Sequence, residues 1–288
     1  IKKIRKIKKV ILIDNFHSNN YRPIFSLQDK NKFSFYKINV DENNSLNNFN
    51  KVDLVIHCAS YTNAENSFTM KNSMRKNNIN CMKNVIDFCL KKNAKLFHLS
   101  TASVYGKQTK IVNEDDDAFL NPQSPYAEIK LIEEKLLKKN KKKLKYMIFR
   151  LGTIAGVSKG MRFHTAINKF CLNAGLNHNI EVYKTAYNQY RPYLSVKDLF
   201  QTFKYCIEKN IYKNDVYNVL SGNYTVKQII TKIKKYKNKV KIKYIKSSIM
   251  NQLSYLVDDK KIKKLGIQLN SDIETDIKET LNLLKAFK

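Results

Sequence analysis

Two short stretches, "STASVYG" and "SPYAEIK", hold a hydroxyl cluster, a tyrosine and a lysine that suit a redox reaction on an alcohol. Tyr126 stands four residues before Lys130, which places both side chains on one face of a helix. Removing a hydride from a carbinol carbon requires that the hydroxyl proton leave too, so a base must reach that oxygen. Thr101 can share the same hydroxyl, with Ser100 and Ser103 as alternatives. We take Thr101, Tyr126 and Lys130 as the predicted catalytic trio.

The spacing of Tyr126 and Lys130 would allow the lysine to lower the pKa of the tyrosine. An unperturbed tyrosine, with a pKa of about 10, is a poor base at neutral pH. An ammonium one helical turn away would stabilise the phenolate and lower that pKa. The same spacing occurs after Tyr193 and Tyr205, where an accidental helix-face pair is the simpler interpretation. Only Tyr126 follows a strand end that carries hydroxyls and a turn, "NPQSP", that predicts a helix start.

The elements that must position this trio alternate between apolar strands and amphipathic helices. One helix is predicted before the hydroxyl cluster, because Met82, Ile86 and Cys89 recur at helical spacing. Strands that are apolar on both faces and separated by such helices predict an α/β fold, a doubly wound parallel sheet with ligands at the carboxyl ends of its strands. The predicted strands lie within residues 8–14, 32–40, 52–60, 94–103 and 144–152.

After Arg150 the alternation loosens, which indicates a smaller lobe built from later segments. Residues 156–170 read as a loop that runs into a helix. The remaining predictions are a strand at 216–221 and helices at 195–209, 225–236 and 272–287.

Composition narrows the classes of function. The formal net charge is +30, but the lysines are spread along all 288 residues, which argues against a dedicated nucleic-acid groove. Five cysteines, odd in number and without C-x-x-C spacing, favour neither a disulfide framework nor a zinc site, and indicate a cytoplasmic protein. No apolar run approaches the roughly 20 residues that cross a bilayer. We expect no metal, no nucleic acid and no membrane partner.

Taken in order, several motifs resemble the extended short-chain dehydrogenase/reductases, in particular the NAD-dependent sugar-nucleotide epimerase/dehydratase group of the UDP-glucose 4-epimerase type. The resemblance implies a Rossmann-like dinucleotide-binding domain at 1–152 and 190–219 and a substrate-binding lobe at 153–189 and 220–288. The matching motifs are "ILIDN", "DLVIHCAS", "NNIN", "STASVYG", "SPYAEIK", "FRLGTIAG" and "RPYLSVKDL".

The cofactor prediction depends on Asp14, which ends the predicted strand "VILID". An acidic residue there accepts hydrogen bonds from an adenosine ribose diol and repels a 2′-phosphate, which favours NAD over NADP. The alternative is an ordinary turn residue. The resemblance implies that Lys130 also binds the nicotinamide ribose beside Tyr126, whereas His57 is expected to pack at its strand end. By the same resemblance the rest of the dinucleotide site comprises Asn15, Val40, Cys58, Ala59, Ser60, Thr62 and Asn77.

The chain departs from the family pattern at its start. "IKKIRKIKKVILID" resembles the end of the family's first helix followed by its second strand. We therefore expect that this sequence is a fragment without the first strand and the glycine-rich loop that holds the cofactor phosphates.

The predicted reaction is epimerisation of a nucleotide sugar through a transient keto intermediate. Family members that eliminate water carry Asp-Glu right after the hydroxyl residue, whereas this chain has Ala102 and Ser103. The alternatives are an NAD-dependent sugar-nucleotide dehydrogenase or reductase and a non-catalytic relative. The oligomeric state, including a homodimer, stays open.

The predicted substrate residues are Arg191, which resembles a phosphate-binding arginine, and Thr153, Arg162 and His164. A guanidinium can also serve only a surface ion pair. The second arginine expected near "KSSIMNQLSY" is absent.

Overall fold

The computed structural model describes residues 4, 6–27, 29, 31–64, 66–246 and 254–285. These residues form two compact units. Unit 1 comprises Ile1–Val104, Ser124–Arg150 and Lys204–Tyr217, and unit 2 comprises Tyr105–Gln123, Leu151–Phe203 and Asn218–Lys288. The functional division predicted from the sequence stays a prediction. Most of the "KSSIMNQLSY" segment, residues 247–253, lies outside the described residues.

Parallel strands form the frame of unit 1, as the apolar runs predicted. A pair, β1 (Val10–Asp14) and β2 (Phe33–Lys37), runs parallel with Val10 opposite Phe33. A four-stranded sheet has the order β10-β6-β4-β3. Its members are β3 (Leu54–His57), β4 (Lys95–Thr101), β6 (Tyr146–Leu151) and β10 (Asp215–Val219).

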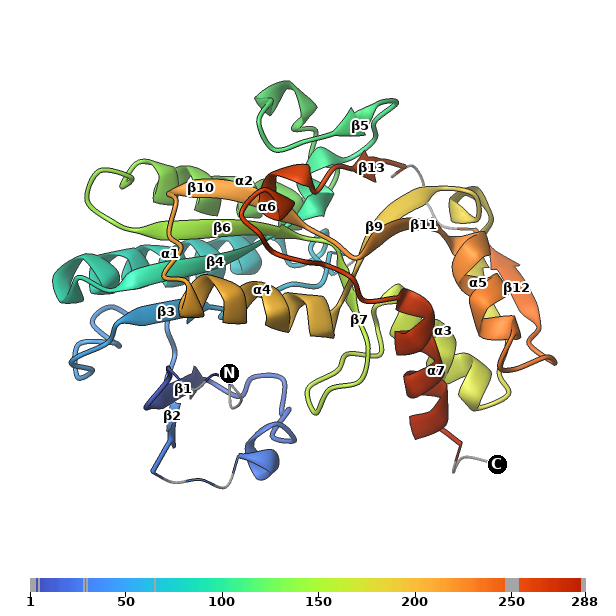
Figure 1. The fold of residues 1–288 in the computed structure, drawn as a ribbon, viewed down its shortest axis with the longest axis horizontal. Coiled ribbons are helices and arrows are strands. Elements are labelled where there is room, and N and C mark those ends of the chain that lie inside the picture. Colours follow the sequence, from blue (N-terminus) through green and yellow to red (C-terminus); the bar gives the residue numbers. More distant parts are fainter. Residues whose placement is uncertain are drawn as a thin grey trace. The chain divides into compact units, whose positions relative to one another are not determined.

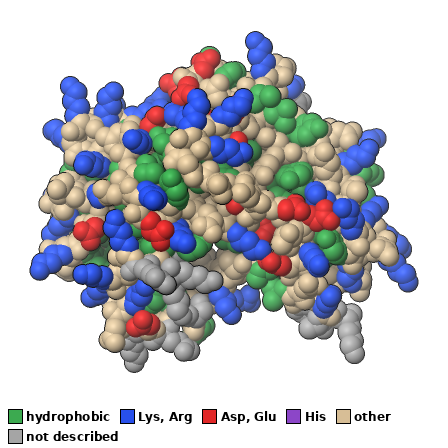
Figure 2. All heavy atoms as spheres, viewed as in Figure 1, with side chains coloured by type: hydrophobic (Ala, Val, Ile, Leu, Met, Phe, Trp, Pro, Cys, Tyr) green, Lys and Arg blue, Asp and Glu red, His purple; other side chains and the backbone are tan. Residues whose placement is uncertain are grey.

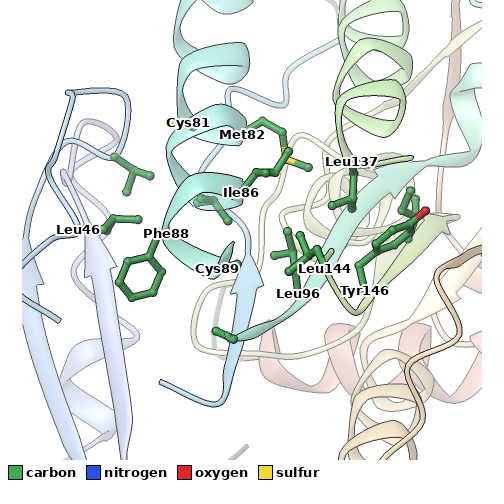
Figure 3. Packing of buried hydrophobic residues seen from close by; sticks show 14 of the residues in the cluster. Leu46, Cys81, Met82, Ile86, Phe88, Cys89, Leu96, Leu137, Leu144 and Tyr146 are labelled. Carbon is green, nitrogen blue, oxygen red and sulfur yellow. The ribbon is translucent and has the colours of Figure 1, made fainter. Parts of the chain in front are cut away.

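Two helices of unit 1 lie side by side on this sheet, α1 (Lys71–Lys92) and α2 (Pro125–Lys138) (Figure 1). The predicted apolar stripe of α1 is buried, with Met82 and Cys89 fully enclosed. Figure 3 shows it facing Leu96 of β4 and Leu137 of α2 in one core. Asn93 ends α1 in the left-handed conformation, at φ 51°. Sheet and helices confirm the predicted α/β class.

Helix α2 begins where the "NPQSP" turn predicted it. Ser124 is extended, at φ −146°, and its Oγ accepts a hydrogen bond from the Ala127 backbone N–H at 3.2 Å. Pro125 follows in the first helical position, where a missing N–H costs nothing. This cap fixes the position of Tyr126 in the first turn.

Unit 2 combines short strands with amphipathic helices. Its core joins Ile167 and Cys171 of α3 to Ile229 and Ile233 of α5 and Ile277 of α7. The sheets have the orders β11-β9-β7, β12-β8 and β13-β5. The strands are β5 (Ile111–Val112), β7 (Thr153–Ala155), β8 (Ile180–Tyr183), β9 (Tyr190–Ser195), β11 (Gly222–Thr225), β12 (Ile242–Ile245) and β13 (Leu256–Val257).

The helices of unit 2 include α3 (Ala166–Gly175), α5 (Val226–Lys234), α6 (Lys260–Lys263) and α7 (Ile273–Leu283). Helix α4 runs from Val196 to Glu208. The sequence predicted α3, α4, α5 and α7, but not the short α6. Short 3-10 turns lie at Ile24–Ser26, Ala102–Tyr105, Asp117–Phe119 and Lys184–Ala186.

The surface carries its cations in scattered positions. On the face in Figure 2, lysine and arginine side chains are spread widely, and acidic side chains lie between them. None of the helices described here has both the length and the apolar composition needed to cross a bilayer. Among the described residues, no group of three or more His, Cys, Asp and Glu side chains could hold a metal ion.

Candidate active site at the end of β4 and the start of α2

The predicted trio lies within unit 1. Thr101 is the last residue of β4, and its Oγ1 lies 2.9 Å from Ser103 Oγ while also accepting from the Ser103 backbone N–H. Tyr126 and Lys130 occupy successive turns of α2. Tyr126 is half-buried, and its phenol and the Lys130 ammonium influence each other electrostatically. The tyrosine and the lysine therefore lie together as their spacing predicted.

Lys130 is held in the interior by a carboxylate that the sequence analysis did not single out. Only 3% of its surface is exposed, and Nζ donates to Glu133 Oε2 at 2.8 Å. Burial acts to lower the pKa of Lys130, but Glu133 and Tyr126 raise it, and the pKa ends above its ordinary value. The available signal was the i,i+3 spacing of Glu133 from Lys130 on the buried face of α2.

A second buried ion pair explains why Thr101 rather than Ser100 is available for chemistry. Glu134 Oε2 accepts from Arg150 Nη2 at 2.7 Å, and its Oε1 accepts from Arg150 Nε at 3.1 Å. Ser100 Oγ donates to the same Oε1 at 2.5 Å. All three side chains are almost completely buried. Ser100 is thus part of a network that ties β4, α2 and β6 together, and Thr101 keeps the half-exposed position.

The predicted cofactor residues after β3 form a loop that is tied to α1. Asn78 is fully buried, and its side-chain amide accepts from the Tyr61 N–H at 2.8 Å and donates to the Tyr61 carbonyl at 3.1 Å. Asn77 donates to Asn78 Oδ1 at 3.0 Å. Within this loop, Cys58 lies near enough to influence the Lys130 ammonium. The sequence analysis quoted "NNIN" but chose Asn77, whereas Asn78 holds the loop that contains Ala59, Ser60 and Thr62.

The residues predicted to read the adenosine side differ in their surroundings. Asp14 is exposed at the carboxyl end of β1, and its Oδ1 accepts from the Phe16 N–H at 2.7 Å. Asn15 Oδ1 accepts from His17 N–H at 3.0 Å. The Val40 side chain packs into the core, and its carbonyl accepts from Asn84. An exposed carboxylate after β1 and an ammonium beside Tyr126 are groups that suit the two ribose diols of a dinucleotide.

His57 lies at the end of β3, packed as expected. Its ring stacks on that of His98, with centroids 5.8 Å apart. Burial, and then the Lys130 charge, lower the pKa of His57 to about 3. The imidazole is therefore neutral at physiological pH.

The predicted substrate residues lie in unit 2. Thr153 of β7 pairs with Tyr193 of β9, the strand that also carries Arg191. Burial raises the pKa of Tyr193 and of Tyr255 to about 12, and the Arg191 guanidinium opposes both rises. Arg191 therefore lies among buried tyrosines, and Tyr255 is a neighbour that the sequence did not indicate.

Arg162 and His164 lie in the loop before α3. Partial burial and the Arg162 charge lower the pKa of His164. The Arg162 carbonyl accepts from Thr165 Oγ1 at 3.2 Å and from Asn168 Nδ2 at 3.0 Å, which fixes the loop to the first turns of α3. These two residues are neighbours, as predicted from their positions in the sequence.

Two surface hollows of unit 1 contain none of the predicted site residues. One is lined by residues of the 43–47 loop and by Asn84, Asp87, Phe88 and Lys91. The other is lined by Asn93, Ala94, Lys95, Asn214 and residues 141–145. Neither hollow includes the carboxyl ends of β1, β3 or β4, so the hydrogen-bonded residues described above define the candidate site better than either hollow.

Comparison with known proteins identifies one family, in agreement with the resemblance seen in the sequence. The family described as "NAD dependent epimerase/dehydratase family" matches residues 4–219. A dTDP-D-glucose 4,6-dehydratase of Dictyostelium discoideum is 30% identical over 232 residues, 74% of this chain and 52% of that protein. A trifunctional UDP-glucose 4,6-dehydratase, epimerase and reductase of Arabidopsis thaliana is covered over 42% of its length. The chain thus spans about half the length of these curated relatives.

Solved structures share the fold. A UDP-glucuronic acid 4-epimerase from Bacillus cereus, in complex with UDP-glucuronic acid and NAD, superposes with a TM-score of 0.84 at 21% identity, over 97% of this chain and 92% of that one. A UDP-N-acetylglucosamine 4-epimerase from Methanobrevibacter ruminantium M1 gives 0.84 at 22% identity, over 96% and 91%. At such identities the likeness shows the fold.

Proposed function

Because the chain belongs to the NAD dependent epimerase/dehydratase family, we propose that its protein is an NAD-dependent epimerase that acts on a nucleotide sugar through a transient keto intermediate. The observation that supports this most is the pairing of Tyr126 with a buried Lys130 ammonium on α2, a helix whose Glu134 accepts a hydrogen bond from Ser100 near the end of β4. A non-catalytic relative that retained only the fold would not need a buried ammonium at Lys130, because an apolar side chain of similar volume is often at least as stable there.

Each member of the trio has a task in the proton transfer. Tyr126 accepts the proton of the substrate hydroxyl when that carbon is oxidised, and returns it when the keto group is reduced. Lys130 stabilises the phenolate through its charge. Thr101 hydrogen-bonds the same substrate oxygen, and Ser103 holds its hydroxyl in place at 2.9 Å.

NAD, the cofactor in the family's description, supplies the acceptor and donor of the hydride when it is bound. Asp14 would accept from the adenosine ribose hydroxyls, and Lys130 would donate to the nicotinamide ribose. The Asn78-held loop would line the ring side with Cys58, Ala59, Ser60 and Thr62, and Asn77 would complete it. Asn15 and Val40 would border the adenosine.

The substrate is proposed to meet unit 2 residues. Arg191 offers a bidentate guanidinium for a diphosphate, and Arg162, His164 and Thr153 would contact the sugar nucleotide. We retain the division into a dinucleotide-binding part, 1–152 and 190–219, and a substrate-binding part, 153–189 and 220–288. The protein is proposed to work in the cytoplasm on a nucleotide-sugar-like molecule, without nucleic acid or membrane partners. A homodimer is the assembly to test first.

Epimerisation is favoured over dehydration by the residues after Thr101. Ala102 is buried and apolar, and Ser103 donates its N–H to Thr101 Oγ1. Neither can supply the additional acid and base that elimination at the neighbouring carbons requires.

The test supplies the full-length protein with a panel of UDP- and dTDP-sugars and NAD. Two epimers should interconvert, detected by chromatography, with no net change in NADH absorbance. Stoichiometric accumulation of NADH would instead identify a dehydrogenase. A keto-deoxy product would identify a dehydratase, and no reaction with any sugar would favour a non-catalytic relative.

A further inference from the structure

A second row of ionisable side chains lies behind Lys130, inside unit 1. Glu133 is fully buried, and its Oε2 lies 2.8 Å from Lys130 Nζ and 3.3 Å from His98 Nε2. The histidine contact is close but not aligned as a hydrogen bond, because neither ring nitrogen of His98 has a hydrogen-bond partner. The His57 ring stacks on that of His98. Among the residues that the structure describes, the cation hydrogen-bonded to Glu133 is the Lys130 ammonium.

The position of Lys130 is unfavourable for a charge. An ammonium that is 97% shielded from water would lose its proton near neutrality if no carboxylate compensated for the lost hydration. Among the groups that oppose this effect of burial on the pKa of Lys130, Glu133 has the largest influence, ahead of Tyr126. Burial in turn raises the pKa of Glu133, and Lys130 opposes that rise. Each charged group therefore offsets the cost of burying the other.

The groups that face Glu133 from other elements do not compete for its charge. Burial lowers the pKa of His57 on β3 to about 3 and that of His98 on β4 well below its ordinary value. On α1, burial raises the pKa of Cys81 to about 12, so its thiol is neutral. Arg150 on β6 is engaged by Glu134, which also repels Glu133. Two more groups act electrostatically on these neighbours, Cys58 on Lys130 and Asp41 on Cys81.

We propose that Glu133 is a positioning residue that keeps the Lys130 ammonium charged and holds it in the interior of unit 1. It touches neither substrate nor cofactor and acts only through Lys130. This inference rests on the proposed function for its catalytic consequence, because a neutral amine at Lys130 would not stabilise the Tyr126 phenolate. The chemical state of the amine itself can be measured without turnover.

The test replaces Glu133 by glutamine, which keeps the shape and removes the charge. Lysine labelled with carbon-13 at Cε reports protonation by NMR, and the signal of Lys130 is identified by its loss in Lys130→Arg. In the parent protein its titration midpoint should lie above the ordinary value of about 10.4. In Glu133→Gln the midpoint should fall by about two units or more. An unchanged midpoint would overturn the proposal.

Two further variants separate charge from packing. Glu133→Asp keeps a carboxylate at a longer distance, and it should restore most of the titration midpoint. If Glu133→Gln fails to fold, Glu133→Asp carries the test, since its midpoint should still fall measurably and an unaltered value would contradict the proposal. Glu128→Gln is the matched control, because Glu128 lies on the same helix, is 48% exposed and lies 3.7 Å from Lys71. Its removal should leave the Lys130 signal unchanged.

Activity then connects the two proposals without confusing them. In Glu133→Gln, the alkaline limb of the pH profile of kcat should move to lower pH by the same amount as the NMR midpoint, while the KM for NAD changes less. A shifted midpoint in a protein that epimerises no sugar would disprove the proposed function and leave the role of Glu133 intact. Full epimerase activity with an unshifted pH profile would disprove the role of Glu133 alone.

Discussion

Buried carboxylates have different partners in the two units. In unit 1, Glu133 and Glu134 each contact a buried cation at 2.7 to 2.8 Å, Lys130 and Arg150 respectively. In unit 2, Asp198 is surrounded by neutral donors, since Ser221 Oγ donates to it at 2.5 Å and Ser271 donates both its N–H and its Oγ.

Asp276 of unit 2 has fewer polar contacts than these carboxylates. It is fully buried, and neither of its oxygens has a hydrogen-bond partner of good geometry, although Ser195 lies near and Lys197 Nζ is 3.9 Å from Oδ1. Burial raises the pKa of Asp276 to about 6. A carboxylate paired with a cation holds a chemical group in place, whereas the raised pKa of Asp276 means that the folded state loses stability as the pH rises toward that pKa.

The largest expected effect breaks a pair in unit 1. Glu134→Ala leaves the Arg150 guanidinium buried and uncompensated and removes the acceptor of Ser100. The free energy of unfolding should fall by about 3 to 5 kcal/mol, measured by urea denaturation. Glu128→Ala on the same helix, exposed and loosely paired, should change it by less than about 0.5 kcal/mol. Equal losses in both variants would mean that burial of the pair is irrelevant.

Replacing Tyr126, one helical turn before Lys130, should reduce catalytic activity without reducing the free energy of unfolding. Tyr126→Phe removes the proton acceptor, so kcat should fall roughly 100-fold or more while NAD affinity stays nearly constant. Tyr205→Phe is the control, because Tyr205 also precedes a lysine by four residues. Similar activity in the two variants would leave Tyr126 with no special role.

The pH dependence of unit 2 should follow Asp276. Its folded pKa is raised above the unfolded value, so its contribution to stability is full below about pH 4 and is lost as pH rises through about 6. In Asp276→Asn this loss disappears, and above pH 7 the variant should be more stable than the parent by at most about 3 kcal/mol. Thermal melts at pH 4, 6 and 8 measure it. Glu181→Gln, which removes an exposed carboxylate of unit 2 that lies 3.7 Å from Lys243 Nζ, should keep the slope.

The smallest expected effect concerns the exposed carboxylate of unit 1. Asp14→Asn can keep the hydrogen bond from the Phe16 N–H but removes the charge. The preference for NAD over NADP should narrow by about fivefold, since an exposed charge contributes about 1 kcal/mol or less. Calorimetric titration of both dinucleotides measures the ratio. A constant ratio would assign Asp14 to the turn alone.

Much of unit 1 could be predicted from the sequence. The family resemblance and the α/β class are confirmed, and each of the five apolar runs contains a strand. The start of α2 was predictable because Ser124 and Pro125 carry a local cap signal. Such signals reside in neighbouring residues, so they survive without knowledge of the tertiary structure.

The contacts that define the site were harder to predict. Glu133 looks like one more charge in "LIEEKL", and only burial distinguishes it from exposed Glu128. Asn78 was overlooked beside Asn77, since nothing local indicates which amide turns inward. The strands β7, β8 and β12 have three or four residues each, too few for periodicity to register. These features depend on partners distant in the sequence.

Asn78 also has a consequence for how this region can change over evolutionary time. Its side-chain amide offers Tyr61 one donor and one acceptor, the same pair that a neighbouring peptide group would offer. The Asn78 side chain thereby makes the two hydrogen bonds that a neighbouring strand would make to Tyr61. The position of the loop after β3 is therefore fixed by a residue of α1. An exchange as small as asparagine for aspartate at this position deletes the donor to the Tyr61 carbonyl, and it should not be tolerated during divergence.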